Sequence, residues 1–193
     1  MEICVIRHGE TDWNLVGRVQ GREDIPLNEN GRLQAEACGL ALKKQGDWKR
    51  WDVVITSPLK RAKETAEIIA KVLNIGEVIE DEGFLERDYG AASGQLLGDL
   101  GVGSNREKFE GEEPFEELTN RIYEAFLNSS ERLLGKNIII VSHGGAINSL
   151  LAKVTDGETG SGKIRLKNAC LNMFTYEKGR VEVVYYNKTA EDF

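Results

Sequence analysis

Cysteine and histidine are scarce in this chain. Its 193 residues include three cysteines and two histidines, and no CxxC pair occurs. An odd number of scattered cysteines argues against a disulfide framework. We therefore expect Cys4, Cys38 and Cys170 to be reduced thiols in the core of a cytoplasmic protein.

A basic leader and long apolar runs are also missing. The first residues, "MEICVIRHGE", contain a short apolar run without a preceding basic region, unlike a signal peptide. No apolar stretch approaches the length that crosses a membrane. We expect a cytoplasmic location and no membrane partner.

Positive charge is in deficit. The formal net charge is -7, and lysine and arginine form no dense block. A chain with this charge pattern is a poor partner for nucleic acid or for an anionic membrane. An anionic substrate would have to be captured by a local cationic pocket.

Five short apolar segments predict β-strands. They are residues 3–6, 53–56, 138–142, 171–176 and 181–186. The first three are continuously apolar, as in parallel strands that are covered on both faces. The last two flank "EKGR", which predicts a hairpin turn.

Four segments with helical spacing lie between the strands. They are residues 31–44, 58–73, 115–134 and 144–154. In the first, Leu33, Ala37, Leu40, Ala41 and Lys44 follow helical spacing. In the second, Ser57 followed by Pro58 predicts a helix that starts with a capping hydroxyl and a proline.

This order of elements predicts an α/β fold. We expect a three-layer α/β/α sandwich with a mostly parallel central sheet and a C-terminal antiparallel edge hairpin. Residues 1–193 suit one domain. Residues 91–114 are glycine-rich and weakly periodic, and we interpret them as a capping loop that sets specificity.

Polar clusters follow three of the predicted strands directly. They are residues 7–10, 57–61 and 142–145. Ligands of open α/β sheets bind outside the carboxyl ends of the strands. If these strands are neighbours, His8, His143, Arg7 and Arg61 converge on one pocket, whereas the alternative is a set of isolated rim residues.

Such a pocket suits an anion better than a metal. Arg7 and Arg61 would repel a cation, and the chain has no HExxH or clustered carboxylate pattern. Arginine forks match phosphate oxygens, and helix N-termini at Ser57 and Gly144 would add oriented N–H groups. We expect no metal and no other cofactor. "GETGSGKI" has P-loop spacing, but Ile164 replaces the hydroxyl residue that magnesium needs.

Five sequence blocks occur in order between Met1 and about Val154. They are "RHGETDWN" (7–14), "QGREDIPLNENG" (20–31), "TSPLKRAKETAE" (56–67), "LERDYG" (85–90) and "VSHGG" (141–145). Together they strongly resemble the histidine phosphatase superfamily, in its phosphoglycerate-mutase-like branch, and within it the broad-specificity phosphatases. Arg-His-Gly alone would be weak evidence, but five ordered blocks are specific.

The resemblance implies roles for matching positions. His8 would be the nucleophile that forms a phosphohistidine, with Arg7, Arg61 and His143 as a cationic clamp around the phosphoryl group. Glu86 would protonate the leaving oxygen, although it could also be an ordinary surface carboxylate. The list of substrate contacts implied by the motifs and the predicted helix N-terminus is Asn14, Gln20, Gly21 and Gly144. Asn14 could instead only cap the segment after it.

Three functions remain open on the sequence. A phosphatase of a small phosphorylated metabolite is favoured over a phosphoglycerate mutase, because residues 105–114 carry two basic and four acidic side chains and would clamp a second anionic group poorly. A non-catalytic module that binds a phospho-ligand is the third reading. The physiological substrate is not readable, and a homodimer is possible but not indicated.

Overall fold

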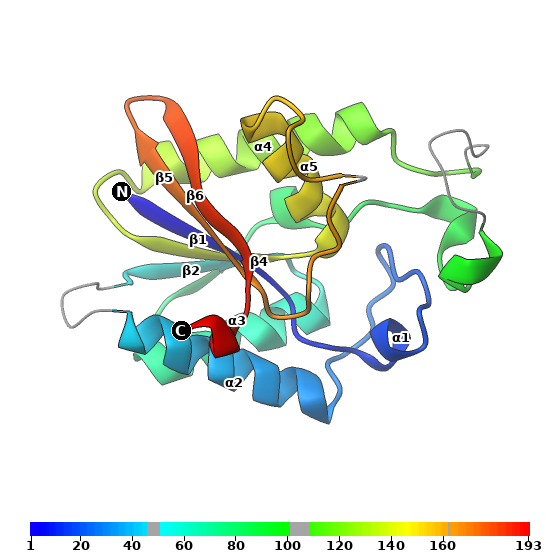
Figure 1. Ribbon diagram of the computed structural model, residues 1–193, viewed down its shortest axis with the longest axis horizontal. Helices are drawn as coiled ribbons and strands as arrows, with labels where there is room; N and C mark the ends of the chain where they lie inside the picture. Colours follow the sequence, from blue (N-terminus) through cyan, green and yellow to red (C-terminus); the bar gives the residue numbers. More distant parts are fainter. Residues whose placement is uncertain (46–50, 101–108, 162) are drawn as a thin grey trace.

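The protein is described by a computed structural model that covers residues 1–45, 51–100, 109–161 and 163–193. Its sheet has six strands in the order β3-β2-β4-β1-β5-β6 (Figure 1). The strands are β1 (Glu2–Arg7), β2 (Val53–Thr56), β3 (Val78–Glu80), β4 (Ile138–Ser142), β5 (Leu171–Glu177) and β6 (Arg180–Lys188). The first four in this order are parallel to one another. Strand β5 runs antiparallel to β1, and β6 runs antiparallel to β5.

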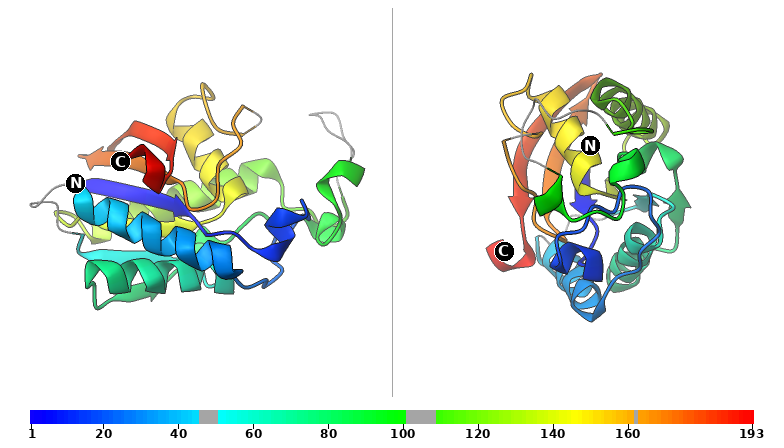
Figure 2. Two further views of the ribbon diagram at one scale, coloured as in Figure 1. Left: turned by 60° about the horizontal axis from the view of Figure 1, so that its bottom comes forward. Right: turned by 90° about the vertical axis from the view of Figure 1, so that its right-hand side faces the viewer.

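Helices cover both faces of the sheet. They are α1 (Asp12–Leu15), α2 (Glu29–Lys44), α3 (Lys60–Leu73), α4 (Phe115–Arg132) and α5 (Gly144–Val154), with short 3₁₀ helices η1 (Glu82–Phe84), η2 (Gly90–Ala92), η3 (Leu97–Asp99) and η4 (Ala190–Asp192). Figures 1 and 2 show α2 and α3 on one face and α4 and α5 on the other. The three-layer sandwich with a C-terminal edge hairpin is therefore confirmed. No described helix has both the length and the apolar character that crossing a membrane requires.

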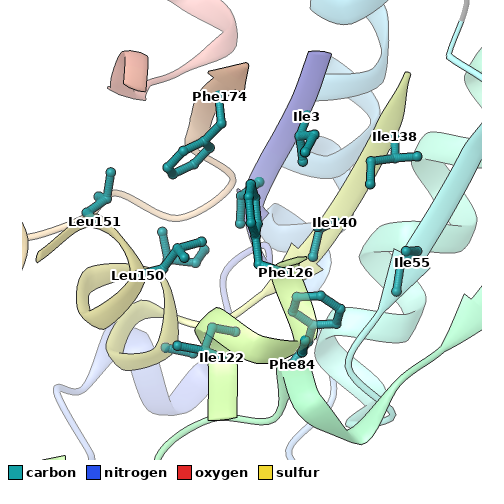
Figure 3. Close-up of a cluster of buried hydrophobic side chains, with 14 of the residues drawn as sticks. Ile3, Ile55, Phe84, Ile122, Phe126, Ile138, Ile140, Leu150, Leu151 and Phe174 are labelled. Carbon is teal, nitrogen blue, oxygen red and sulfur yellow. The ribbon is translucent and has the colours of Figure 1, made fainter. Parts of the chain in front are cut away.

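The core consists of two apolar layers, one on each side of the sheet. Side chains alternate along a strand, so Ile3 and Val5 of β1 face α4 and α5, while Cys4 and Ile6 face α2 and α3. Figure 3 shows the first layer, where Phe126 packs near the strands. Burying continuous apolar strands on both faces holds their carboxyl ends in a fixed plane.

The predicted helix is present as α2, but the residues noted for their helical spacing do not form its buried face. Leu33 is 60% exposed and Leu40 is 46% exposed, and Lys44 is exposed too. The buried face instead consists of small residues and one leucine: Gly31, Ala35, Cys38, Gly39, Ala41 and Leu42. The reason is a close approach to α3, since a Cβ on Gly39 would lie 2.9 Å from the Cβ of Val72. Small side chains let the two helices pack closely.

Two other helix ends and one edge strand differ from expectation. Helix α3 begins at Lys60 with Leu59 as its N-cap, so neither Ser57 nor Pro58 starts it. Helix α4 ends at Arg132. Strand β3 was not predicted, because three residues carry too little pattern. The predicted hairpin is present, with positive φ at Lys178 and Gly179 between β5 and β6.

The start of the predicted capping loop pairs with another loop. The N–H of Val19 donates to the carbonyl of Gln95 over 2.9 Å, and the N–H of Gly94 donates to the carbonyl of Val19 over 2.8 Å. The N–H of Leu97 donates to the carbonyl of Gly17 over 2.8 Å. Residues 94–97 and 17–19 thus form one backbone-paired unit. Residues 101–108 of the predicted loop lie outside the described residues.

Candidate active site

A pocket of about 380 Å³ lies at the carboxyl edge of the sheet, near α1 in Figure 1. His8 follows β1, Ser57 follows β2 and His143 follows β4. Because these parallel strands end at the same edge of the sheet, the three residues lie close together. Of the predicted site residues, the following line the pocket: Arg7, His8, Asn14, Gln20, Gly21, Arg61, Glu86 and Gly144. His143 is fully buried, with its ring centroid 5.2 Å from that of His8.

The imidazole of His8 is held in one tautomer. Its Nδ1 lies 2.6 Å from the carbonyl oxygen of Gly9, which can only accept, so Nδ1 carries the proton. Its Nε2 therefore bears a lone pair. Burial, followed by the charges of Arg61 and Arg7, holds the pKa of His8 well below its ordinary value. His8 is consequently neutral at pH 7, and its unprotonated Nε2 accepts a hydrogen bond from Nε of Arg61.

The backbone beside His8 requires glycine. A Cβ on Gly9 would lie 2.3 Å from the carbonyl oxygen of Gly31, at the start of α2. The N–H of Gly9 donates to Oγ1 of Thr65 in α3 over 3.1 Å. This close crossing joins the end of β1 to both helices of one layer, so the position of His8 is fixed from two sides.

Arg61 is a fully buried cation that faces His8. Its Nε lies 3.3 Å from Nε2 of His8. Its Nη1 donates to the carbonyl of Glu23 over 2.6 Å, and its Nη2 donates to the carbonyl of Gly21 over 2.8 Å. Burial lowers the pKa of Arg61 to about 10, with Glu86 and Asp24 opposing the shift, so the guanidinium keeps its charge at pH 7.

Arg7 and His143 each present a buried nitrogen without a partner. Arg7 Nη1 donates to the carbonyl of Leu166 over 2.5 Å, whereas its Nε contacts no acceptor among the described residues. Nδ1 of His143 likewise has no partner there. Buried polar atoms are normally satisfied, so unpaired nitrogens beside a pocket suit an acceptor that comes from a ligand.

Ser57 sets the orientation of His143. Its Oγ lies 2.8 Å from Nε2 of His143 and receives the N–H of Leu59 over 3.4 Å. A serine hydroxyl can accept two hydrogen bonds and donate one, so this contact orients the ring in either tautomer; the ring proton lies on Nδ1 when the hydroxyl donates to Nε2. Burial, followed by Arg61 and other nearby cations, holds the pKa of His143 well below its ordinary value. The sequence had suggested Ser57 only as a helix cap.

The N-terminus of α5 holds Glu86. The N–H of Gly145 donates to Oε2 over 3.0 Å, and the N–H groups of Ala146 and Arg87 donate to Oε1 over 2.9 Å each. A Cβ on Gly145 would lie 2.6 Å from Oε1, so glycine makes this approach possible. The expectation that this helix end serves a phosphate is thus corrected for these N–H groups, although Gly144 itself lines the pocket.

Asn14 and Gln20, the predicted substrate contacts, accept hydrogen bonds within the protein through their amide oxygens, which leaves their amide nitrogens as donors for a ligand. Oδ1 of Asn14 accepts from the N–H of Thr11 over 3.2 Å and from Nδ2 of Asn168 over 3.1 Å. Oε1 of Gln20 lies 3.0 Å from the Thr11 hydroxyl. Asn14 also closes the capping box of α1, which confirms the alternative interpretation that this residue caps the segment.

Several pocket residues were not singled out from the sequence. They are Arg18, Tyr89, Asn148 and Arg165. Tyr89 belongs to the "LERDYG" block, which was a usable signal. Arg18 and Arg165 lie in loops, where no spacing rule links them to a site. Among the described residues, no group of three or more His, Cys, Asp or Glu side chains could hold a metal ion.

Comparison with known proteins agrees with this geometry. Residues 3–189 match the model of the histidine phosphatase superfamily (branch 1). The chain is 40% identical over 185 residues to the uncharacterized phosphatase PhoE of Bacillus subtilis, covering 96% of this chain and 93% of that protein. It is 34% identical over 185 residues to a metal-independent phosphoserine phosphatase of Arabidopsis thaliana, covering 89% and 75%.

A solved structure gives the same result for the fold. The phosphoserine phosphatase of Entamoeba histolytica in complex with 3-phosphoglyceric acid matches with a TM-score of 0.86 and 28% sequence identity, covering 100% of this chain and 99% of that chain. The fold is thus that of the phosphoglycerate-mutase-like phosphatases. This chain belongs to the histidine phosphatase superfamily, and it is a phosphatase.

Proposed function

We propose that this protein hydrolyses a phosphomonoester of a small metabolite through a phosphohistidine on His8. The observation that carries the proposal is the unprotonated Nε2 of a neutral, buried imidazole, which accepts a hydrogen bond from the Arg61 guanidinium over 3.3 Å. A histidine nucleophile must be unprotonated to attack phosphorus. Cations around it would bind the equatorial phosphoryl oxygens while they keep the ring neutral.

In the first half-reaction, Nε2 of His8 attacks phosphorus. The N–P bond forms as the P–O ester bond breaks, and the leaving oxygen takes a proton from the Glu86 carboxyl group. Arg7, Arg61 and the Nδ1–H of His143 stabilise the charge on the transferring group. Preorganised donors of this kind contribute about 3 to 4 kcal/mol each to a transition state. Asn14 and Gln20 donate further hydrogen bonds from their amide nitrogens.

In the second half-reaction, water attacks phosphorus and the N–P bond breaks. Glu86 takes a proton from the water, which restores its starting form, and His8 regains its lone pair. Phosphate then leaves. No metal takes part in either step, because fixed cations of the protein supply the positive charge.

The test combines turnover with trapping of the intermediate. A panel of phosphomonoesters that includes p-nitrophenyl phosphate and O-phosphoserine should show release of phosphate in the presence of EDTA. A rapid quench with a ³²P-labelled substrate should give an acid-labile, base-stable adduct on His8. A phosphoryl adduct on serine or aspartate would refute the mechanism, and absence of turnover across the panel would refute the activity.

The two alternatives give different results in the same experiments. A phosphoglycerate mutase would isomerise 3-phosphoglycerate and would be stimulated by 2,3-bisphosphoglycerate. A non-catalytic module would bind phosphate esters without releasing phosphate. Neither is favoured by a specific observation at the pocket.

A further inference from the structure

We propose that the pocket also recognises a second anionic group, on the leaving-group part of the substrate, through Arg18 and Arg165. The proposal rests on the phosphatase function above and adds a substrate class to it. The relevant chemistry is a carboxylate or a second phosphate at the pocket mouth, outside the residues that contact the phosphoryl group.

Local charge is the first observation. The described residues that line the pocket include four arginines, Arg7, Arg18, Arg61 and Arg165, and one acid, Glu86. The whole chain, by contrast, has 32 acidic and 25 basic residues. Arg7 and Arg61 sit beside His8 and are assigned to the phosphoryl group. The remaining two arginines add positive charge that the transfer step does not use.

Arg18 is fixed in place by contacts that leave its charge uncompensated. Its Nη1 donates to the carbonyl of Gly94, and its guanidinium lies 5.4 Å from the ring centroid of Trp13. Neither contact supplies a carboxylate. The side chain is exposed, and no described acid is within ion-pair distance. The charge is therefore available to a ligand at the mouth.

Arg165 extends from a loop that is anchored on both sides. Its carbonyl accepts from Nδ2 of Asn187 over 3.2 Å, and the next carbonyl, of Leu166, accepts from Arg7. The Arg165 side chain is exposed, and the described residues supply it no carboxylate partner. Its charge is close enough to lower the pKa of Arg7 further, after the larger effect of burial. It thus adds to the positive field that the phosphoryl site already has.

The sequence argument against a second anion does not hold for the described residues. Glu112 pairs with Arg87 over 3.1 Å, and Glu113 pairs with Arg121 over 3.0 Å and with Arg22 over 3.7 Å. These carboxylates are neutralised by arginines of their own, and neither lines the pocket. The charges of Glu112 and Glu113 therefore do not oppose the arginines that line the pocket.

The decisive experiment compares two substrates that differ only in a carboxylate. O-phosphoserine and O-phosphoethanolamine share the phosphate, the amine and a primary alcohol as the leaving group. We expect the wild-type protein to prefer phosphoserine in kcat/KM by about tenfold or more, since its carboxylate gains a charge-assisted hydrogen bond from an arginine. The preference should decrease as salt rises from 0.05 to 0.5 M, because the mouth is exposed.

Variants assign the preference to the two arginines. Arg165→Gln should lower kcat/KM for phosphoserine about tenfold and for phosphoethanolamine by less than threefold, and Arg18→Gln/Arg165→Gln should abolish the preference. Arg165→Lys should retain more of it than Arg165→Gln does. Arg32→Gln is the matched control, because Arg32 is exposed, pairs with Glu64 and lies outside the pocket.

A second pair distinguishes the source of the anion and covers slow turnover of amines. 3-Phosphoglycerate against glycerol 1-phosphate tests a carboxylate, and fructose 1,6-bisphosphate against fructose 6-phosphate tests a second phosphate. Equal kcat/KM within every pair, or turnover of p-nitrophenyl phosphate alone, would overturn the inference and leave the phosphatase function intact. No turnover of any ester would instead overturn the proposed function.

Discussion

The floor and the wall of the pocket are built in different ways. The floor, defined as His8, Arg61 and His143, consists of buried side chains at the carboxyl ends of strands or in the first turn of α3. The wall, defined as residues 17–19, 94–97 and 164–166, consists of loops that leave Arg18, Leu97 and Arg165 exposed, and the first two of these segments pair through their backbones. The floor residues are buried next to the hydrophobic core, whereas the wall residues lie in surface loops.

From this difference we expect the floor to set the rate of phosphoryl transfer and the wall to set the choice of substrate. Each floor side chain has at least one hydrogen bond that fixes its direction, to the carbonyl of Gly9, to the carbonyls of Gly21 and Glu23, or to the hydroxyl of Ser57. Wall side chains are fixed mainly at their backbones. A substitution in the floor should therefore change the rate for every substrate, and a substitution in the wall should change the ranking of substrates.

We expect the largest effect on kcat at His8, the proposed nucleophile in the floor of the pocket. His8→Ala should reduce kcat by about 10⁴-fold or more for all substrates, because no other described side chain takes the place of Nε2. Steady-state kinetics with p-nitrophenyl phosphate measures this, and far-UV circular dichroism checks the fold. Residual activity above a tenth of wild type would show that the floor does not contain the nucleophile.

The next effect is expected at Arg61. Arg61→Gln should lower kcat/KM by about 10²- to 10³-fold, since it removes a charged donor from the transferring group. Arg61 also lowers the pKa of His8, so its loss raises that pKa, and His8 becomes protonated at a higher pH.

The pH profile separates these two contributions of Arg61. In the wild-type protein, the acid limb of kcat/KM should lie well below pH 6.5, because His8 stays neutral there. In Arg61→Gln, the limb should move to higher pH by an amount that burial of the ring limits. A rate loss with an unmoved acid limb would mean that Arg61 acts on the phosphoryl group alone.

Ser57 should show a smaller effect, because it acts through His143. Ser57→Ala removes the hydroxyl that is hydrogen-bonded to Nε2 of His143, and we expect kcat to fall about tenfold, equivalent to about 1.4 kcal/mol. ¹⁵N chemical shifts of the His143 ring should change toward mixed tautomers. Ser130→Ala is the control, since this buried hydroxyl donates to the carbonyl of Phe126 within α4. An unchanged ring tautomer in Ser57→Ala would contradict the positioning role.

The smallest effect is expected at an apolar wall residue. Leu97 is 57% exposed where it lines the pocket, so Leu97→Ala should change KM by only about threefold and leave kcat for p-nitrophenyl phosphate within about twofold. Measuring both constants on several esters sharpens the contrast with the floor. A loss of kcat across all esters would place this wall segment in the transfer step and break the distinction.

The sequence predicted the floor well because its signals are local. Apolar runs followed at once by Arg7-His8 or Ser142-His143 identify strand ends, and parallel strands bring such ends together. The sheet and the sandwich follow from the same runs. Ser57 was recognised at its position, but its partner is 86 residues away, so its contact with His143 could not be read from spacing.

The wall was not predictable in the same way. Backbone pairing between residues 17–19 and 94–97 depends on φ and ψ and leaves no periodic pattern of side chains. Strand β3 and the buried face of α2 could not be predicted for related reasons. The strand has only three residues, and the buried face of the helix consists mostly of small side chains, so both carry little hydrophobic signal. Ion pairs such as Glu113 with Arg121 also changed what a simple count of charge meant.

The three N–H groups that hold Glu86 have a consequence for the timing of the proposed reaction. A carboxyl group fixed at three points does not swing between two partners. Glu86 must give its proton and take the next one at a single place, so the departing alcohol and the incoming water occupy that place in succession. The alcohol must leave first. Each phosphoryl group is then displaced twice in line, with inversion each time, and the configuration at phosphorus is retained over a complete turnover.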